Sequence, residues 1–240
     1  MRLRTYLVLK LKIFFSHSKN LNSFVNAWKS SNIPGEQFEI VSKQLTAFEG
    51  GDIIPEFKVF LDHLNFIQLE NHSKIIEIGC SSGYYSEVVE FYNPTFRYFG
   101  IDFSTKFIEL ALDIYPQKNF LVADANFLPV KPGALDCVVL GSVLLHLKKW
   151  EEALKKAADL NSNFLIVHRQ PIIIDKPSYY YFKNAYSTKM FEWVINRDHL
   201  IEVLLSLYYE LVKESIVNFN SITHYSSMLP TTSTFTFKKL

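Results

Sequence analysis

Cysteine is scarce in this sequence. The 240 residues include only two cysteines, Cys80 and Cys137, and both lie in or beside apolar runs. Two such residues cannot make a disulfide framework, and the Cys-x-x-Cys spacing of a metal site is absent. We interpret both as small buried hydrophobic residues. The sequence therefore predicts no metal site and a reducing, cytoplasmic location.

An excess of charge of either sign is also missing. Lys and Arg number 25 against 24 Asp and Glu, so the formal net charge is +1. Nucleic-acid-binding domains are usually strongly basic, so this balance argues against a nucleic-acid partner. A small molecule or a saccharide is favoured as the substrate. Hydrophobic residues make up 48%, enough for a full core.

No hydrophobic run is long enough to span a bilayer. The leading segment MRLRTYLVLKLKIFF (1–15) is interrupted by Lys10 and Lys12, and no small-residue cleavage site follows it. If it is helical, its basic residues fall on several faces, which is unlike a membrane-surface helix. We expect a packed leading helix, with peripheral membrane contact as the open alternative.

Alternating strand and helix patterns begin at Lys74. Residues 1–70 read as helices separated by polar breaks, so we expect an N-terminal helical extension there and a second domain over 71–240. Strand-length apolar runs occupy 74–79, 97–102, 119–124, 135–141 and 163–169, and helical patterns occupy 84–92, 105–115 and 148–160. This alternation predicts a parallel sheet with helices on both faces.

The C-terminal third has a different pattern. We read FEWVI (191–195) and HLIEVLLSLYY (199–209) as helical, followed by late strands at 209–217 and 232–240. The last two should form an antiparallel pair at the sheet edge. The predicted fold is α/β, a Rossmann-like, doubly wound, mostly parallel seven-stranded sheet whose last strand is antiparallel.

The glycines of a dinucleotide-binding turn are largely missing. The Gly-x-Gly-x-x-Gly motif of such a turn has three glycines. The corresponding residues here are Gly79, Ser81 and Tyr84, so only the first position matches. Glu77, just before the turn, would repel a pyrophosphate but suits a ligand that carries a positive charge or amine donors. An NAD-dependent oxidoreductase is therefore disfavoured.

Acidic residues end three successive predicted strands. Glu77 ends the first, and Asp102, 23 residues after Gly79, ends the second, where it can accept the hydroxyls of a ribose. Asp124 ends the third, beside Ala125, where an adenine amine could bind. Each acid also has a simpler interpretation: Glu77 as a helix cap, Asp102 as the N-cap of the next helix, and Asp124 as a turn residue.

Four segments together resemble the class I S-adenosylmethionine-dependent methyltransferases. They are IIEIGCSSGYYS (75–86), YFGIDFSTKFIELA (98–111), ADANFLPV (123–130) and LDCVVLGSVLLHL (135–147). The resemblance implies S-adenosylmethionine as the cofactor. It departs from the family at Ser81, which replaces a glycine and is tolerable if its φ stays negative. LNSN (160–163) also replaces the usual Lys-Pro-Gly-Gly turn.

The resemblance also implies a set of cofactor contacts. Glu77 would lie near the methionine amino group, Asp102 would hold the ribose, and Phe103 would flank the adenine. The remaining implied contacts are Gly79, Cys80, Ser81 and Gly83 beneath the cofactor, Asp124 and Ala125 at the adenine edge, and Gly141 and Ser142 beside the methionine part and the acceptor.

Two histidines are candidate catalytic bases for an oxygen acceptor. His146 and His168 follow or end predicted strands on the cofactor side, and neutral imidazole can take a proton during methyl transfer. The alternative for His146 is a structural residue bonded to backbone. Arg169 could clamp an acidic acceptor or form a local salt bridge. The aromatic segment 176–187 could form a lid with the N-terminal helices, or pack its rings on the sheet.

The resemblance implies in-line methyl transfer. We expect a small molecule or sugar as the acceptor, with transfer to oxygen. No Asn-Pro-Pro-Tyr stretch follows the fourth predicted strand, which argues against methylation of a base or amide nitrogen. SVLLHL and VHRQPI are faintly similar to methyltransferases associated with surface-polysaccharide synthesis. A non-catalytic protein that keeps the methyltransferase fold as a scaffold is the main alternative. The sequence leaves the oligomeric state open.

Overall fold

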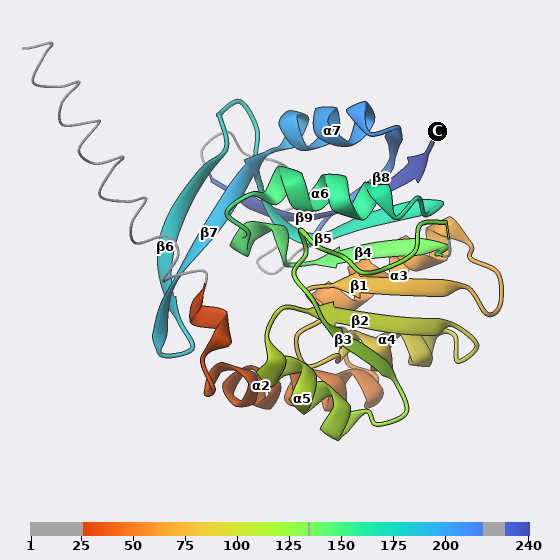
Figure 1. Ribbon diagram of the computed structural model, residues 1–240, viewed down its shortest axis with the longest axis vertical. Coiled ribbons are helices and arrows are strands. Elements are labelled where there is room, and N and C mark those ends of the chain that lie inside the picture. The colour runs from red at the N-terminus through yellow and green to blue at the C-terminus, as the bar shows by residue number, and fades with distance from the viewer. Residues whose placement is uncertain (1–25, 134, 218–228) are drawn as a thin grey trace, which may run out of the picture.

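The computed structural model describes residues 26–133, 135–217 and 229–240 (Figure 1). Within them the chain forms one nine-stranded sheet, ordered β3-β2-β1-β4-β5-β7-β6, with β9 paired to β5 and β8 paired to β9. Helices cover both faces of the sheet, as Figure 1 shows. The Rossmann-like, mostly parallel α/β fold is therefore confirmed, and the two strands beyond the predicted seven are described below.

Five parallel strands form the central part of the sheet. In sheet order they are β3 (Asn119–Val122), β2 (Arg97–Asp102), β1 (Lys74–Ile78), β4 (Cys137–Gly141) and β5 (Phe164–Ile173). The chain runs outward from β1 to β3 and then returns to β4 on the other side of β1. This reversal creates a crevice beyond the carboxyl ends of β1 and β4, where open α/β sheets bind ligands.

Apolar helix faces cover the sheet on both sides. One cluster joins the strands to α6 (Trp150–Asp159) and α7 (Arg197–Ser206), with Leu154 and Leu200 fully buried. The opposite cluster contains α4 (Tyr85–Tyr92), while α5 (Thr105–Ile114) follows β2. Because both faces are covered, every residue of β4 is buried, which explains its continuous apolar sequence.

The N-terminal helices share this second core. A short 3-10 helix, η1 (Asn26–Lys29), precedes α2 (Ile33–Glu49) and α3 (Pro55–Ile67), and both α-helices have proline in the first turn. Phe57, Phe60 and Leu64 pack with α4 and the sheet. The predicted leading helix at 1–15 lies outside the described residues. In the ranges that are described, no helix has the length and apolar character needed to cross a membrane.

The predicted C-terminal strand pair is confirmed. β8 (Tyr209–Ile216) and β9 (Thr231–Lys239) are antiparallel, and β9 also pairs with β5 in antiparallel register. Phe235 and Phe237 of β9 are fully buried. β9 thus contributes two aromatic side chains to the apolar core.

The helical interpretation of FEWVI was wrong, and the predicted strand count was too low for the same reason. These residues belong to β7 (Thr188–Asn196), which forms an antiparallel hairpin with β6 (Tyr179–Ala185). A short apolar run fits a helix or a strand equally in its spacing, and the β-branched and aromatic composition decided for a strand. The hairpin extends from the sheet beside η1 (Figure 1), with which β7 is in contact.

Candidate functional site

A cavity of about 310 Å³ lies at the carboxyl edge of the parallel strands. Residues at the ends of β1, β2, β3 and β4 form one wall. The opposite wall contains Trp28 of η1, Gln37 of α2 and residues of the β6–β7 hairpin. Two segments were predicted to form a lid, the N-terminal helices and the aromatic segment 176–187. Both border the cavity.

Glycine is required where the backbone turns into this cavity. Gly79 has a φ of +81°, and a Cβ there would lie 2.6 Å from Cβ of Val143. A Cβ at Gly141 would collide with the carboxylate of Glu77. These two glycines let β1 and β4 approach each other closely at the crevice.

Glu77 is a buried carboxylate in the cavity wall. Its side chain is 3% exposed and accepts a hydrogen bond from the Tyr98 hydroxyl. Burial raises the pKa of Glu77 to about 8, although the Tyr98 hydroxyl and the charge of Arg169 both oppose the rise. A cationic group of a ligand that binds beside Glu77 would therefore stabilise its ionised form further.

Asp102 braces the glycine turn from β2. Its carboxylate accepts the backbone N–H of Ser81 at 3.0 Å and that of Ser104 at 2.9 Å. Burial raises the pKa of Asp102 to about 6, against these backbone hydrogen bonds. Ser104 is the N-cap residue of α5, so the cap position falls two residues after Asp102. Asp102 lines the cavity as well.

Ser81 adopts the left-handed backbone conformation, with a φ of +47°. A serine here was expected to be tolerated if its φ stayed negative, and this condition is not met. The turn keeps the shape that glycine would give it, because Asp102 accepts the Ser81 N–H. A non-glycine residue in this region costs roughly 1 kcal/mol or more.

Ser81→Gly is expected to stabilise the protein by about 0.5–1 kcal/mol, because glycine adopts a positive φ without strain. Urea unfolding of the ligand-free protein measures the change. The neighbouring Ser82 has no positive φ, so Ser82→Gly should be destabilising. Equal effects of the two substitutions would contradict the assignment of strain to Ser81.

The remaining predicted cofactor residues of β2 and β3 also border the cavity. Phe103, Asp124 and Ala125 all line it, and Lys29 Nζ lies 5.5 Å from the centroid of the Phe103 ring. Asp124 is exposed and accepts hydrogen bonds from the backbone and side-chain amides of Asn126, at 2.8 and 3.0 Å. Asp124 therefore both stabilises a local turn and borders the cavity.

Comparison with known proteins connects this geometry to a family. Residues 76–161 match the family model described as a methyltransferase domain, which spans β1 to α6 and every acid discussed above. Residues 76–161 are thus similar to methyltransferase domains. The match gives no support to the similarity with proteins of surface-polysaccharide synthesis. No curated protein matches this chain.

Solved structures share the fold of this chain at low sequence identity. An S-adenosylmethionine-dependent methyltransferase from Clostridium acetobutylicum ATCC 824 is 9% identical, with a TM-score of 0.59, over 84% of this chain and 98% of that one. The magnesium protoporphyrin IX methyltransferase ChlM from Synechocystis PCC 6803, solved with bound SAH, is 13% identical, with a TM-score of 0.56, over 77% and 81%. The [4+2]-cyclase SpnF is 14% identical, with a TM-score of 0.57, over 88% and 96%.

Two predicted contacts of the methyltransferase domain point away from the cavity. Cys80 is buried, and its N–H donates to the Ile101 carbonyl at 3.0 Å. Gly83 has a φ of +75°, and a Cβ there would collide with the Phe120 ring. Neither residue lines the cavity. Both serve the packing of the turn, whereas Gly141 and Ser142 line the cavity.

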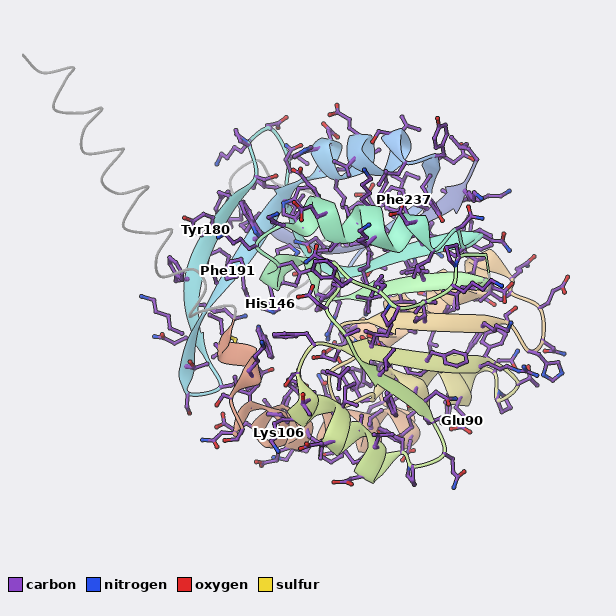
Figure 2. The ribbon with its side chains drawn as sticks, viewed as in Figure 1. Glu90, Lys106, His146, Tyr180, Phe191 and Phe237 are labelled. Carbon is purple, nitrogen blue, oxygen red and sulfur yellow. The ribbon has the colours of Figure 1, made fainter. Side chains whose placement is uncertain are left out.

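His146 lies at the cavity, in the 3-10 helix η2 (Leu144–His146) after β4. Its Nδ1 is 3.2 Å from the carbonyl oxygen of Phe191 in β7, and both residues are labelled in Figure 2. A carbonyl only accepts, so Nδ1 carries the proton and Nε2 keeps its lone pair. Burial lowers the pKa of His146 to about 4, which keeps the imidazole neutral at pH 7.

His168 is fully buried and does not line the cavity. Its Nε2 is 2.7 Å from the Tyr85 hydroxyl and its Nδ1 is 2.8 Å from Oγ1 of Thr234. Burial holds its pKa well below the usual range. With both ring nitrogens occupied by hydroxyls of the core, the geometry gives no support to His168 as a base.

Trp28 and Glu192 line the cavity but were not predicted from the sequence. Trp28 packs against His146, with ring centroids 4.7 Å apart, and against Tyr186 at 5.7 Å. Glu192 is buried and pairs with Lys183 Nζ at 2.6 Å and with the Tyr181 hydroxyl at 2.7 Å. These residues come from three distant parts of the chain, so no local spacing connects them. The aromatic richness of 176–187 was the only available signal.

Proposed function

We propose that this methyltransferase transfers a methyl group from S-adenosylmethionine to an oxygen atom of a small molecule or sugar. The proposal depends on one observation: Glu77, Asp102 and Asp124, from three successive strands, border one cavity together with Gly79. An acid for an ammonium group, an acid for ribose hydroxyls and a polar group for an adenine amine are the recognition groups that this cofactor requires.

The residues present fit the cofactor. Glu77 would hold the amino group of the methionine part, and the close backbone approach at Gly79 and Gly141 leaves the crevice open beside it. Asp102 would bind the ribose and Phe103 would flank the adenine, with Asp124 and Ala125 at its edge. Ser142 would border the methionine part and the acceptor.

When bound, S-adenosylmethionine supplies a methyl group already activated on a sulfonium. The chain then needs to orient the acceptor, exclude water and accept a proton. His146 is our candidate for the last task, because its Nδ1–H is held by the Phe191 carbonyl and its Nε2 keeps a lone pair. Trp28 packs against His146, and Tyr186 of the hairpin turn packs against Trp28.

His146→Ala is expected to slow methyl transfer to an oxygen acceptor by roughly 10²-fold or more, the usual contribution of a general base. The affinity for S-adenosylhomocysteine should remain within about twofold, since no cofactor contact is assigned to this residue. Single-turnover rates and calorimetric titration give the two quantities. Unchanged transfer rates would return His146 to a structural role.

The division of labour follows the two parts of the chain. We assign cofactor binding to residues 71–240 and a lid function to residues 1–70, of which Trp28 and Gln37 border the cavity. The hairpin would complete the lid. The balanced charge and the scarcity of cysteine support a cytoplasmic location and a partner other than nucleic acid.

Thermal unfolding with S-adenosylhomocysteine, and separately with NAD, tests the proposal. At a hundred times its dissociation constant, a ligand that binds only the native state adds about 2.7 kcal/mol to the stability. We expect a higher Tm with S-adenosylhomocysteine and no change with NAD. A protein that responds to neither would favour the scaffold alternative. Methyl transfer from labelled S-adenosylmethionine to a panel of hydroxylated small molecules and sugars would then identify the acceptor.

A further inference from the structure

Arg169 has a backbone conformation that arginine rarely adopts. Its φ is +57°, and the pairing of β5 with β9 shifts register between Val167 and Gln170. Such a conformation costs of order 1–3 kcal/mol and persists only where the surrounding contacts impose it. Bulges of this kind are frequent beside active sites, where they redirect a side chain.

The irregularity directs Arg169 into the cavity, whose wall it joins. Nε of Arg169 donates to the Ser142 hydroxyl at 2.9 Å, and Nη2 donates to the Tyr84 hydroxyl at 3.0 Å. The guanidinium carbon lies 5.7 Å from the centroid of the Tyr85 ring. Two neutral hydroxyls and an aromatic face thus fix the guanidinium group without neutralising its charge.

Arg169 lacks an anionic partner within the part of the chain that the structure describes, since its side-chain hydrogen bonds all go to hydroxyls. Glu77 is within electrostatic reach, because Arg169 lowers its pKa, but the Glu77 carboxylate bonds to Tyr98. Lys183, the other cation of the wall, is already paired with Glu192. A partly buried, fixed guanidinium without a carboxylate partner is suited to an incoming anion.

We infer that Arg169 binds a carboxylate group of a ligand in this cavity. The inference rests on the proposed function and extends it to a binding residue. The carboxylate has two potential sources, the amino-acid end of the cofactor and the methyl acceptor. Ser142, which anchors Arg169, follows β4, and Tyr84 precedes α4, so the guanidinium lies across the crevice that both ligands would share.

Calorimetric titration of Arg169→Gln with two adenosyl compounds separates these sources. S-adenosylhomocysteine has the amino-acid end, whereas 5′-deoxy-5′-methylthioadenosine lacks it. Benzoate, added to protein saturated with 5′-deoxy-5′-methylthioadenosine, probes a carboxylate of an acceptor. Arg97→Gln is the matched control, because Arg97 is exposed at the start of β2, at the opposite end of the strand from the cavity.

With a cofactor carboxylate, Arg169→Gln should weaken S-adenosylhomocysteine roughly tenfold or more and leave 5′-deoxy-5′-methylthioadenosine unchanged. With an acceptor carboxylate, both adenosyl compounds should bind as in wild type, and only the benzoate response should disappear. Arg169→Lys should recover part of the loss, since it keeps the charge without the planar fork. Equal binding of all three probes by wild type and Arg169→Gln would overturn the inference.

Two further results keep the inference distinct from the proposed function. Should wild type bind neither adenosyl compound, the proposed function fails, and benzoate binding to the ligand-free protein then decides about Arg169 alone. Should Arg169→Gln fail to fold, Tyr84→Phe replaces it, because this variant removes the hydroxyl that fixes Nη2. An unchanged affinity of Tyr84→Phe for every probe would count against the inference.

Discussion

Glu77→Gln is expected to weaken S-adenosylhomocysteine binding roughly 100-fold or more while making the ligand-free protein more stable above pH 5. The loss of affinity follows because an amide cannot pair with the ammonium group of the ligand. The gain in stability follows because the carboxylate is 3% exposed and burial raises its pKa to about 8. Gln has the same shape and can still accept from the Tyr98 hydroxyl.

The sign of the pH dependence follows from the raised pKa. Glu77 has an ordinary value of 4.5 when unfolded and about 8 when folded, so between these values the native state binds more protons. Its contribution to stability is therefore complete below pH 4.5 and is lost as the pH rises towards 8. The advantage of the Gln variant should grow by up to about 1.4 kcal/mol per pH unit across this window.

The same ionisation links ligand binding to proton release. In the ligand-free protein at pH 7 the Glu77 carboxyl group is mainly protonated, and it must ionise to pair with an ammonium group. S-adenosylhomocysteine should therefore bind up to roughly tenfold more tightly per unit as the pH rises to about 8. Calorimetry at pH 7, in two buffers with different ionisation enthalpies, measures the proton released.

Glu87→Gln is the control for both effects. Glu87 accepts a tyrosine hydroxyl as Glu77 does, from Tyr115 at 2.7 Å, and burial raises its pKa as well. Glu87 does not line the cavity, so the affinity of the Glu87→Gln variant for S-adenosylhomocysteine should stay at the wild-type value. A Glu77→Gln variant that bound like this control would refute the ammonium assignment.

The meeting of three acids at one cavity could be predicted from the sequence, because these residues follow one another along the chain. Each acid ends a strand, and parallel strands end at one edge of the sheet, so Glu77, Asp102 and Asp124 had to meet. Cys80 and Gly83 show the limit of this logic. They lie in the same turn but do not line the cavity, because the Cys80 side chain is buried and the Gly83 backbone lies against the Phe120 ring.

The contacts of Trp28, His146 and Tyr186 could not be predicted in the same way. Trp28, His146 and Tyr186 meet only because η1, η2 and the hairpin fold over one another. The hairpin itself was hidden, since FEWVI has the spacing of either a helix or a strand. The prediction that His168 ends the fifth strand was wrong, because β5 continues to Ile173. The irregular pairing between Val167 and Gln170 leaves Arg169 at the cavity and His168 in the core.

Asp102→Ala is expected to lower the affinity for S-adenosylhomocysteine by roughly 100-fold or more, because two ribose hydroxyls lose a charged acceptor. The variant should also lose about 1–3 kcal/mol of stability, since the buried N–H groups of Ser81 and Ser104 lose their acceptor. It should nevertheless remain folded, because the apolar core is untouched. Titration calorimetry and urea unfolding measure the two effects separately.

Asp136→Ala separates the loss of binding from the loss of a backbone hydrogen bond. Asp136 accepts the N–H of Lys74 at 2.8 Å, at the amino ends of β1 and β4, away from the cavity. Its removal should cost about 1 kcal/mol of stability and leave the ligand affinity unchanged.

In the wild type the affinity for S-adenosylhomocysteine should also fall below pH 6, where Asp102 gains a proton. Wild-type affinity in Asp102→Ala would remove the ribose assignment, and with it the strongest reason for placing an adenosyl group across β2.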